Sequence, residues 1–133
     1  MARVRATRAG AILAVSDFEA SLAFYRDRLG LEVDATYDDP PYATLLAAGA
    51  RVSLAEEGHP AEDRPGVEMA APDDPARASV VLVLEVEDAD AVHTSLEAEG
   101  VHFLAEPYSP PWGGRRFFCV DPDGYLVEIE QPA

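Results

Sequence analysis

The sequence predicts an α+β fold of two consecutive βαβββ modules, because two stretches of the chain show the same order of features. Each stretch begins with an apolar run that predicts a strand, residues 11–15 and residues 80–86. An aspartate follows each run, and then an amphipathic segment ends at a glycine. The duplication predicts one domain, 1–133, made of module 10–55, an acidic linker 56–79 and module 80–131.

Both predicted helices have start and stop signals. Asp17 and Asp88 precede the amphipathic segments, where a carboxylate can accept free backbone N–H groups. Gly30 and Gly100 follow them, and glycine suits the left-handed position just after a helix. The apolar residues between these ends recur at helical spacing: Phe18, Leu22, Tyr25 and Leu29 in the first helix, and Ala89, Val92 and Leu96 in the second. We therefore expect each helix to pack through this face.

Apolar segments after each helix predict the remaining strands. They are residues 31–36, 42–47 and 51–55 in the first module, and 101–106, 115–120 and 125–130 in the second. The sequence Asp121–Gly124 (DPDG) favours a tight hairpin turn. Pairing centred on this turn sets Phe117 opposite Glu128 and Arg115 opposite Glu130. We therefore expect Glu128, Arg115 and Phe117 to share the sheet face that lies away from the helix.

The composition excludes several classes of partner. With 25 acidic and 10 basic residues, the net charge of −15 leaves few residues to build the basic face that nucleic-acid binding needs. Such a surface also disfavours anionic lipid, and no apolar run approaches the roughly 18 residues of a membrane span. The single Cys119 excludes a disulfide framework. These features predict a cytoplasmic protein; the acidity serves either solubility alone or the attraction of neutral or cationic small molecules.

Several motifs in this order resemble one known superfamily. They are Val15-Ser-Asp17, Ala23-Phe-Tyr25, Leu29-Gly-Leu31 and the closing segment 112–128 (WGGRRFFCVDPDGYLVE). Together they resemble the vicinal oxygen chelate superfamily, which includes glyoxalase I, extradiol dioxygenases, fosfomycin-resistance enzymes and bleomycin-resistance proteins. The resemblance implies two modules whose sheets curl around a cleft, and a homodimer that completes it. Because this fold hosts several chemistries, the resemblance leaves the activity open.

The resemblance also implies where a metal would bind. Metal-using members place ligands at positions that correspond here to Gly10, Val81, a position near Ser53, and Glu128. Glycine and valine offer no donor atom, and a neutral serine hydroxyl is a poor ligand. The histidines fall elsewhere, at His59, His93 and His102. We therefore expect no metal and no other cofactor.

The remaining candidates are ligand-binding residues, and no catalytic residue is assigned. Glu128 either receives a cationic or hydroxyl group of a ligand, or is paired with an arginine as a structural group. Trp112, between prolines and glycines, either forms a stacking wall or is a plug at the end of the core or at the dimer contact. The full candidate set, including tyrosines expected to flank the strand ends, is Glu128, Trp112, Arg115, Phe117, Tyr42, Tyr108, Tyr37 and Ser53.

Three hypotheses about function follow. The first is a metal-free small-molecule-binding protein of the bleomycin-resistance type, which sequesters an antibiotic or a similar aromatic or cationic metabolite. The second is a lyase, isomerase or dioxygenase of the same superfamily, including a metal-free enzyme that uses Glu128 as general base. The third is a regulatory module whose cleft is filled by its own side chains.

Overall fold

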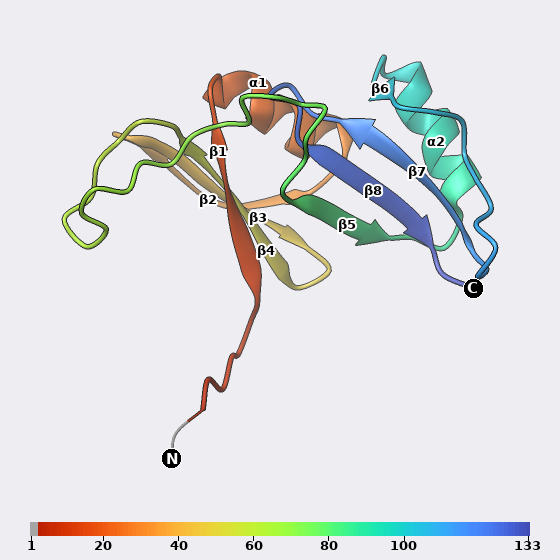
Figure 1. Ribbon diagram of the computed structural model, residues 1–133, viewed down its shortest axis with the longest axis horizontal. Coiled ribbons are helices and arrows are strands. Elements are labelled where there is room, and N and C mark those ends of the chain that lie inside the picture. The colour runs from red at the N-terminus through yellow and green to blue at the C-terminus, as the bar shows by residue number, and fades with distance from the viewer. Residues whose placement is uncertain (1–2) are drawn as a thin grey trace. The chain divides into compact units, whose positions relative to one another are not determined.

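The computed structural model describes residues 3–133 and divides the chain into two compact units, Met1–Ala71 and Pro72–Ala133 (Figure 1). Each unit has one four-stranded mixed sheet and one helical segment, in the order βαβββ. The predicted α+β class and the two βαβββ modules are therefore confirmed. The boundary between the units falls inside the predicted linker.

The first unit is built on a sheet with the strand order β1-β4-β3-β2. Its strands are β1 (Gly10–Val15), β2 (Glu32–Asp38), β3 (Pro41–Ala47) and β4 (Ala50–Glu56). Strand β1 pairs in parallel with β4, and the other neighbours are antiparallel. A parallel pair requires a crossover connection, and the helix between β1 and β2 supplies it.

The first helix changes its hydrogen-bond pattern halfway. The α-helix α1 (Phe18–Ala23) begins at Asp17, whose carboxylate accepts a hydrogen bond from the Ala20 amide at 3.1 Å. It continues as a π-helix, η1 (Phe24–Arg28), where the sequence predicts one uninterrupted helix. Gly30, at φ 79°, ends it as predicted.

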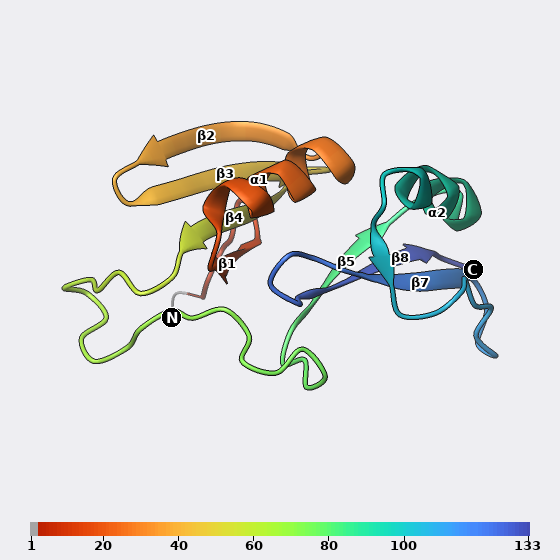
Figure 2. The same cartoon turned by 90° about the horizontal axis from the view of Figure 1, so that it is seen from above.

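One face of the first sheet is the core and the other is open. Helix α1 packs on β3 and β4 (Figure 2). The covered face contributes the fully buried strand residues Val15, Ala43, Leu45 and Leu54, together with nearly buried Val52. The other face has no helix of its own unit on it, and we call it the open face of the first unit.

The second unit repeats this plan with the strand order β5-β8-β7-β6. Its elements are β5 (Val81–Glu85), α2 (Ala89–Ala98), β6 (His102–Phe103), β7 (Arg115–Val120) and β8 (Leu126–Gln131). Helix α2 packs on β7 and β8, and Asp88 accepts the Ala91 amide at 3.0 Å as the predicted cap. Strand β6 is shorter than the predicted 101–106, and the chain rejoins β7 through a bridge between Tyr108 and Arg116.

The predicted register of the last hairpin is wrong by one residue. Asp121 pairs with Tyr125 through a backbone hydrogen bond of 3.0 Å, so the turn holds one residue more than the four predicted. Phe118 therefore lies opposite Glu128, and Arg116 lies opposite Glu130. Because side chains alternate between faces, this shift moves Arg115 and Phe117 to the helix-covered face. The face of the second sheet that α2 does not cover, which we call the open face of the second unit, carries Arg116 and Phe118 instead.

The acidic segment after β4 is a hydrogen-bonded loop. The Gly58 amide donates to the Met69 carbonyl at 3.1 Å, which brings the two ends of the loop together. Arg64 donates to the carbonyls of Val67 and His59 at 2.7 and 2.8 Å.

Among residues 3–133, no helix is long and apolar enough to cross a membrane.

The hairpin register generates a stability prediction at Asp121, which is 5% exposed. Its Oδ1 atom accepts the amides of Asp123 and Tyr125 at 2.9 and 2.8 Å. Asp121→Ala leaves these donors without that acceptor and should lower the free energy of unfolding by about 2 kcal/mol. Asp121→Asn keeps an acceptor oxygen and is the matched control. Urea unfolding of both variants measures the effect, and equal stabilities would contradict this role for the carboxylate.

Candidate functional site

Two neighbouring carboxylates lie on the open face of the second unit. Glu128 and Glu130 are two residues apart on β8, so their side chains point to the same side of the sheet. Glu128 is only 8% exposed. Burial raises the pKa of Glu128, and hydrogen bonding and charge repulsion from Glu130 raise it further, while Arg116 lowers it. This pair therefore favours retaining a proton above the pH at which a solvated glutamate loses it.

Arg116 is the charged neighbour of Glu128, but it is held mainly by aromatic rings. Its Nη1 atom lies 3.8 Å from Glu128 Oε1, at the outer limit of an ion pair. The guanidinium carbon lies 5.3 Å from the Trp112 ring centroid and 5.1 Å from that of Phe118. These cation–π contacts position Arg116 between two rings. Of the two alternatives for Glu128, a structural ion pair is present, but it is long and leaves Glu130 without an arginine partner within residues 3–133.

Aromatic groups border this open face. Trp112 is 73% exposed and Tyr108 is 53% exposed, so neither ring belongs to the core. A pocket of about 180 Å³ is lined by Tyr108, Arg116 and Phe118 among others, and a smaller one of about 110 Å³ is lined by Trp112, Arg116 and Glu130 among others. A plug at the end of the core does not fit the exposure of Trp112.

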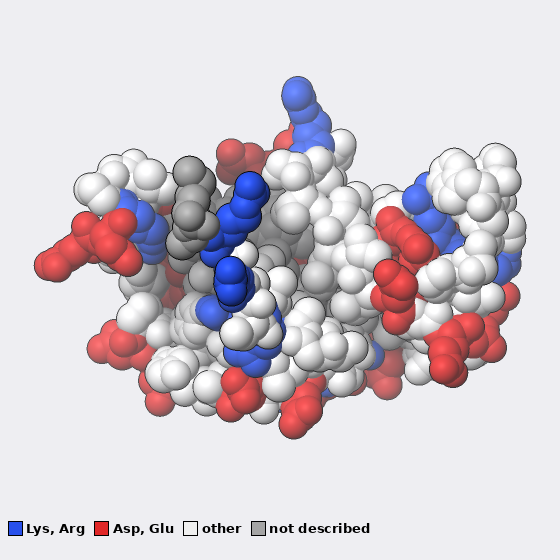
Figure 3. Space-filling view, turned by 90° about the horizontal axis from the view of Figure 1, so that it is seen from below, with Lys and Arg blue, Asp and Glu red and all other residues white. Residues whose placement is uncertain are grey.

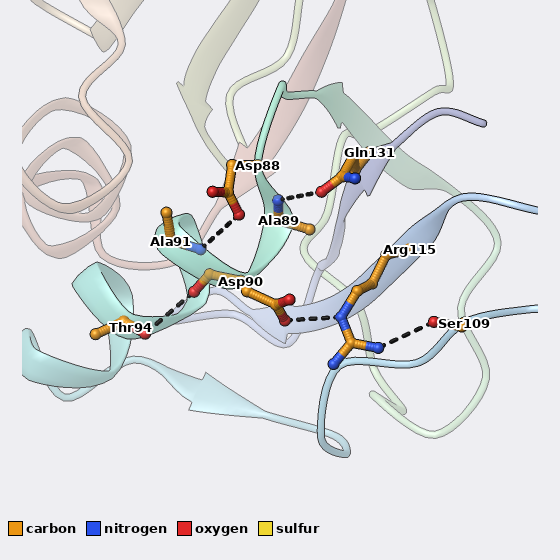
Figure 4. Close-up of polar contacts among 8 residues, drawn as sticks. All are labelled: Asp88, Ala89, Asp90, Ala91, Thr94, Ser109, Arg115 and Gln131. Atoms are coloured by element: carbon orange, nitrogen blue, oxygen red, sulfur yellow. Dashed lines mark hydrogen bonds and ion pairs between the residues drawn. The ribbon is translucent and has the colours of Figure 1, made fainter.

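Two candidates from the sequence lie on the other face of the second sheet. Arg115 donates to Asp90 Oδ1 on α2 at 2.7 Å and to Ser109 Oγ at 3.0 Å (Figure 4). Phe117 is 2% exposed and packs edge-to-face on His93 and Phe103, with ring centroids 5.0 and 5.4 Å apart. Both residues therefore have structural contacts on this face. Their expected position beside Glu128 is wrong, because the hairpin register differs by one residue from the predicted one. Cys119 is buried there too, which raises its pKa to about 12.

A separate polar cluster lies on the open face of the first unit. Arg51 donates from Nε to Ser53 Oγ at 2.8 Å and from Nη2 to the Tyr42 hydroxyl. Ser53 is fully buried, and its hydroxyl lies 3.3 Å from that of Thr44. Burial raises the pKa of Tyr42, but hydrogen bonds with Ser53, Arg51 and Thr44 outweigh this and hold the pKa below its ordinary value. Tyr37, 59% exposed, leans on Tyr42 with ring centroids 6.0 Å apart.

Sequence reasoning missed Arg51, Arg116 and Glu130 as site residues. Arg51 had a usable signal, because it lies two residues before Ser53 on a predicted strand and so shares its face. Glu130 had the same kind of signal, because it lies two residues after Glu128 on a predicted strand. Arg116 depended on the hairpin register, and the composition of the turn did not specify the length of the turn.

The positions that correspond to metal ligands do not fit a divalent cation. Gly10 and Val81 carry no donor atom. The Ser53 hydroxyl already accepts a hydrogen bond from a guanidinium, which places a positive charge where a cation would bind. Within residues 3–133 no group of three histidine, cysteine or acidic side chains is arranged to hold a metal ion.

Two βαβββ modules with polar groups on their open sheet faces define the class of fold shared by glyoxalases and their relatives. The model of the Glyoxalase/Bleomycin resistance protein/Dioxygenase superfamily matches residues 7–129, and the chain belongs to this superfamily. The sequence resemblance to this group is thus confirmed at the level of the superfamily.

The similar proteins include an uncharacterized protein, an enzyme and an antibiotic binding protein. The uncharacterized protein YraH of Bacillus subtilis is 30% identical over 118 residues, covering 88% of this chain and 91% of YraH. The ethylmalonyl-CoA/methylmalonyl-CoA epimerase of Cereibacter sphaeroides is 32% identical over 124 residues, covering 90% and 92%. The structure of TnmS3, an antibiotic binding protein from Streptomyces sp. CB03234, superposes with a TM-score of 0.71 at 24% identity, covering 99% and 100%. This last likeness shows the fold alone.

The raised pKa of Glu128 generates a pH prediction. At a pH below the ordinary value of 4.5, the glutamate is neutral in both the folded and unfolded states. As the pH rises through the raised pKa, the folded protein must ionise a desolvated carboxyl, and stability is lost. Glu128→Gln removes this loss, so the variant should gain stability relative to wild type between about pH 4 and neutral pH. Urea unfolding across this range measures the difference.

The exposed residue Glu99, at the end of α2, provides the control. Glu99→Gln changes the net charge by the same amount as Glu128→Gln. A parallel pH trend in both variants would assign the effect to net charge and contradict a specific cost at Glu128.

Proposed function

We propose that the protein binds, without a metal, a small molecule with an aromatic part and a cationic or hydroxyl group, on the open face of the second unit. The observation that carries the proposal is the Glu128–Glu130 pair, in which Glu128 is 8% exposed and Glu130 lines a pocket together with the exposed Trp112. A ligand amine at this pair would replace the shared proton by a charge-assisted hydrogen bond.

The aromatic surroundings support the same ligand class. Trp112 and Tyr108 are exposed aromatic residues, and Trp112 lines a pocket together with Glu130, so a stacked ligand would cover aromatic surface there. Arg116 contacts both Trp112 and Phe118, which supports a role of these rings in contacting a planar cation. Binding sites for small molecules typically combine such apolar walls with a few polar anchors.

We propose further that the protein is a homodimer whose role is to sequester an antibiotic or a similar metabolite. TnmS3, an antibiotic binding protein with the same fold, supports this role. Sequestration requires affinity and no reaction, so it needs neither a metal nor a nucleophile. Native mass spectrometry of protein purified without chelator tests the subunit number and the absence of metal together. A dimer with one divalent metal ion per subunit would overturn this assignment.

An enzyme is the second candidate, and the relative named as an epimerase favours it. Glu128 would act as general base, because a carboxylate with a raised pKa is a stronger base than an ordinary glutamate. The discriminating measurement is deuterium incorporation from D₂O into methylmalonyl-CoA. Exchange that Glu128→Gln abolishes would establish the enzyme, whereas no exchange is expected for a sequestering protein.

Phenethylamine, an aromatic amine, is a suitable probe for the binding proposal. Trp112 is the single tryptophan of the chain, so its fluorescence reports binding at this face directly. Glu128→Gln should weaken binding about tenfold, because a charge-assisted hydrogen bond is lost. The neutral analogue 2-phenylethanol should bind more weakly than the amine to wild type, and Glu99→Gln is the control variant. Equal affinities of wild type and Glu128→Gln would remove Glu128 from the site.

A further inference from the structure

Arg51 is a half-buried arginine held by neutral groups. Its two hydrogen bonds go to the hydroxyls of Ser53 and Tyr42, and neither oxygen carries a formal charge. The arginines that form ion pairs within residues 3–133 are Arg26, Arg115 and Arg116, and Arg51 is not among them. In a chain with 25 acidic and 10 basic residues, a fixed guanidinium that faces no carboxylate is unexpected.

The hydroxyl cluster fixes the direction of the guanidinium. Ser53 is fully buried and Thr44 is 8% exposed, so the groups that hold Arg51 Nε cannot move freely. Tyr42 holds Nη2 from the neighbouring strand β3. Nη1 makes no hydrogen bond to residues 3–133, so donors of this planar group remain for a ligand. A guanidinium held in this way presents its remaining N–H groups in the geometry that oxyanions prefer.

A pocket of about 550 Å³ adjoins Arg51. It is lined by residues 7–12, which comprise the start of β1 and the segment before it, and by Arg51 itself. Its lining contains two arginines, Arg8 and Arg51, and no acidic residue. Arg3, Arg5 and Arg8, in the segment before β1, are exposed. Figure 3 shows basic side chains close together on one face of the molecule.

Gly10 is needed for the close packing of this pocket wall. A Cβ atom at Gly10 would lie 2.4 Å from the backbone oxygen of Arg51, which no side chain tolerates. The glycine thus lets β1 approach β4 at Arg51. Positive charge, fixed donors and space for a ligand therefore coincide at one place in an otherwise acidic protein.

We propose that this pocket binds the oxyanion group of a small molecule, a carboxylate or a phosphate monoester, through Arg51 with support from Arg8. The proposal goes beyond the function proposed above: it concerns the first unit, requires neither Glu128 nor Trp112, and adds an anionic group to the ligands the protein can take. Local charge would attract such a group against the net charge of −15.

The test uses benzoate and phenyl phosphate as probes, with benzyl alcohol as the neutral control, at constant ionic strength. The Nε–Hε signal of Arg51 in NMR spectra of ¹⁵N-arginine-labelled protein reports binding at this residue. We expect saturable shifts with at least one anion and none with the alcohol. Arg51→Gln should weaken binding of that anion, followed by calorimetry, about tenfold or more. Arg26→Gln, which removes an exposed arginine paired with Asp27, should leave it unchanged.

Further variants keep the test decisive. Tyr42→Phe retains the charge but releases one anchor of Arg51, and should weaken binding about fivefold. If Arg51→Gln fails to fold, as judged by circular dichroism, Tyr42→Phe and Arg51→Lys carry the comparison. Tighter binding of phenyl phosphate assigns a phosphate ligand, and tighter binding of benzoate assigns a carboxylate.

Two results would overturn the proposal. One is the lack of any saturable shift at Arg51 with both anions. The other is equal anion affinity in wild type and in the folded variants at Arg51 and Tyr42. Neither result affects the phenethylamine measurement on Glu128→Gln, so failure here is distinguishable from failure of the function proposed for the second unit.

Discussion

The turn at Asp121 determines which side chains the second unit presents on its open face. One buried carboxylate accepts two backbone amides of the turn, and this arrangement makes Asp121 pair with Tyr125. Every pairing along β7 and β8 follows from that step, because side chains alternate between faces. A turn shorter by one residue would bury Arg116 under α2 and place Phe117 beside Glu128. The turn between Asp121 and Tyr125 thus determines which residues of β7 lie on the same face as Glu128.

Each open face carries charged groups that make no tight ion pair, carboxyl groups in the second unit and a guanidinium in the first. In the second unit, two carboxylates lie together and the nearest guanidinium is 3.8 Å away, held by aromatic rings. In the first unit, a guanidinium is held by neutral hydroxyls. A charge that is positioned by neutral groups keeps most of its field for a ligand, whereas a tight ion pair cancels it. Arg115 and Asp90, at 2.7 Å, show the contrast on the helix-covered face.

The sequence was sufficient for the architecture because its signals there are local and repeated. Asp17 and Asp88 cap the helices as expected, and the strands other than β6 lie close to their predicted bounds. The face assignments in the last hairpin were not predictable in the same way. DPDG is compatible with turns of more than one length, and the choice rests on the hydrogen bonds of Asp121 in the folded state. Arg51 shows the converse: alternation along the predicted strand was enough to put it on the same face as Ser53, and this signal was missed.

The positions to which the sequence resemblance assigns metal ligands have residues with another structural role in this chain. A position that could hold a ligand has glycine, and that glycine lets β1 pack closely against Arg51. The serine at another such position accepts a hydrogen bond from the same arginine. A guanidinium and a divalent cation repel each other, so one position cannot serve both. The first unit therefore supplies a permanent positive charge from its own sequence, next to positions to which the sequence resemblance assigns metal ligands.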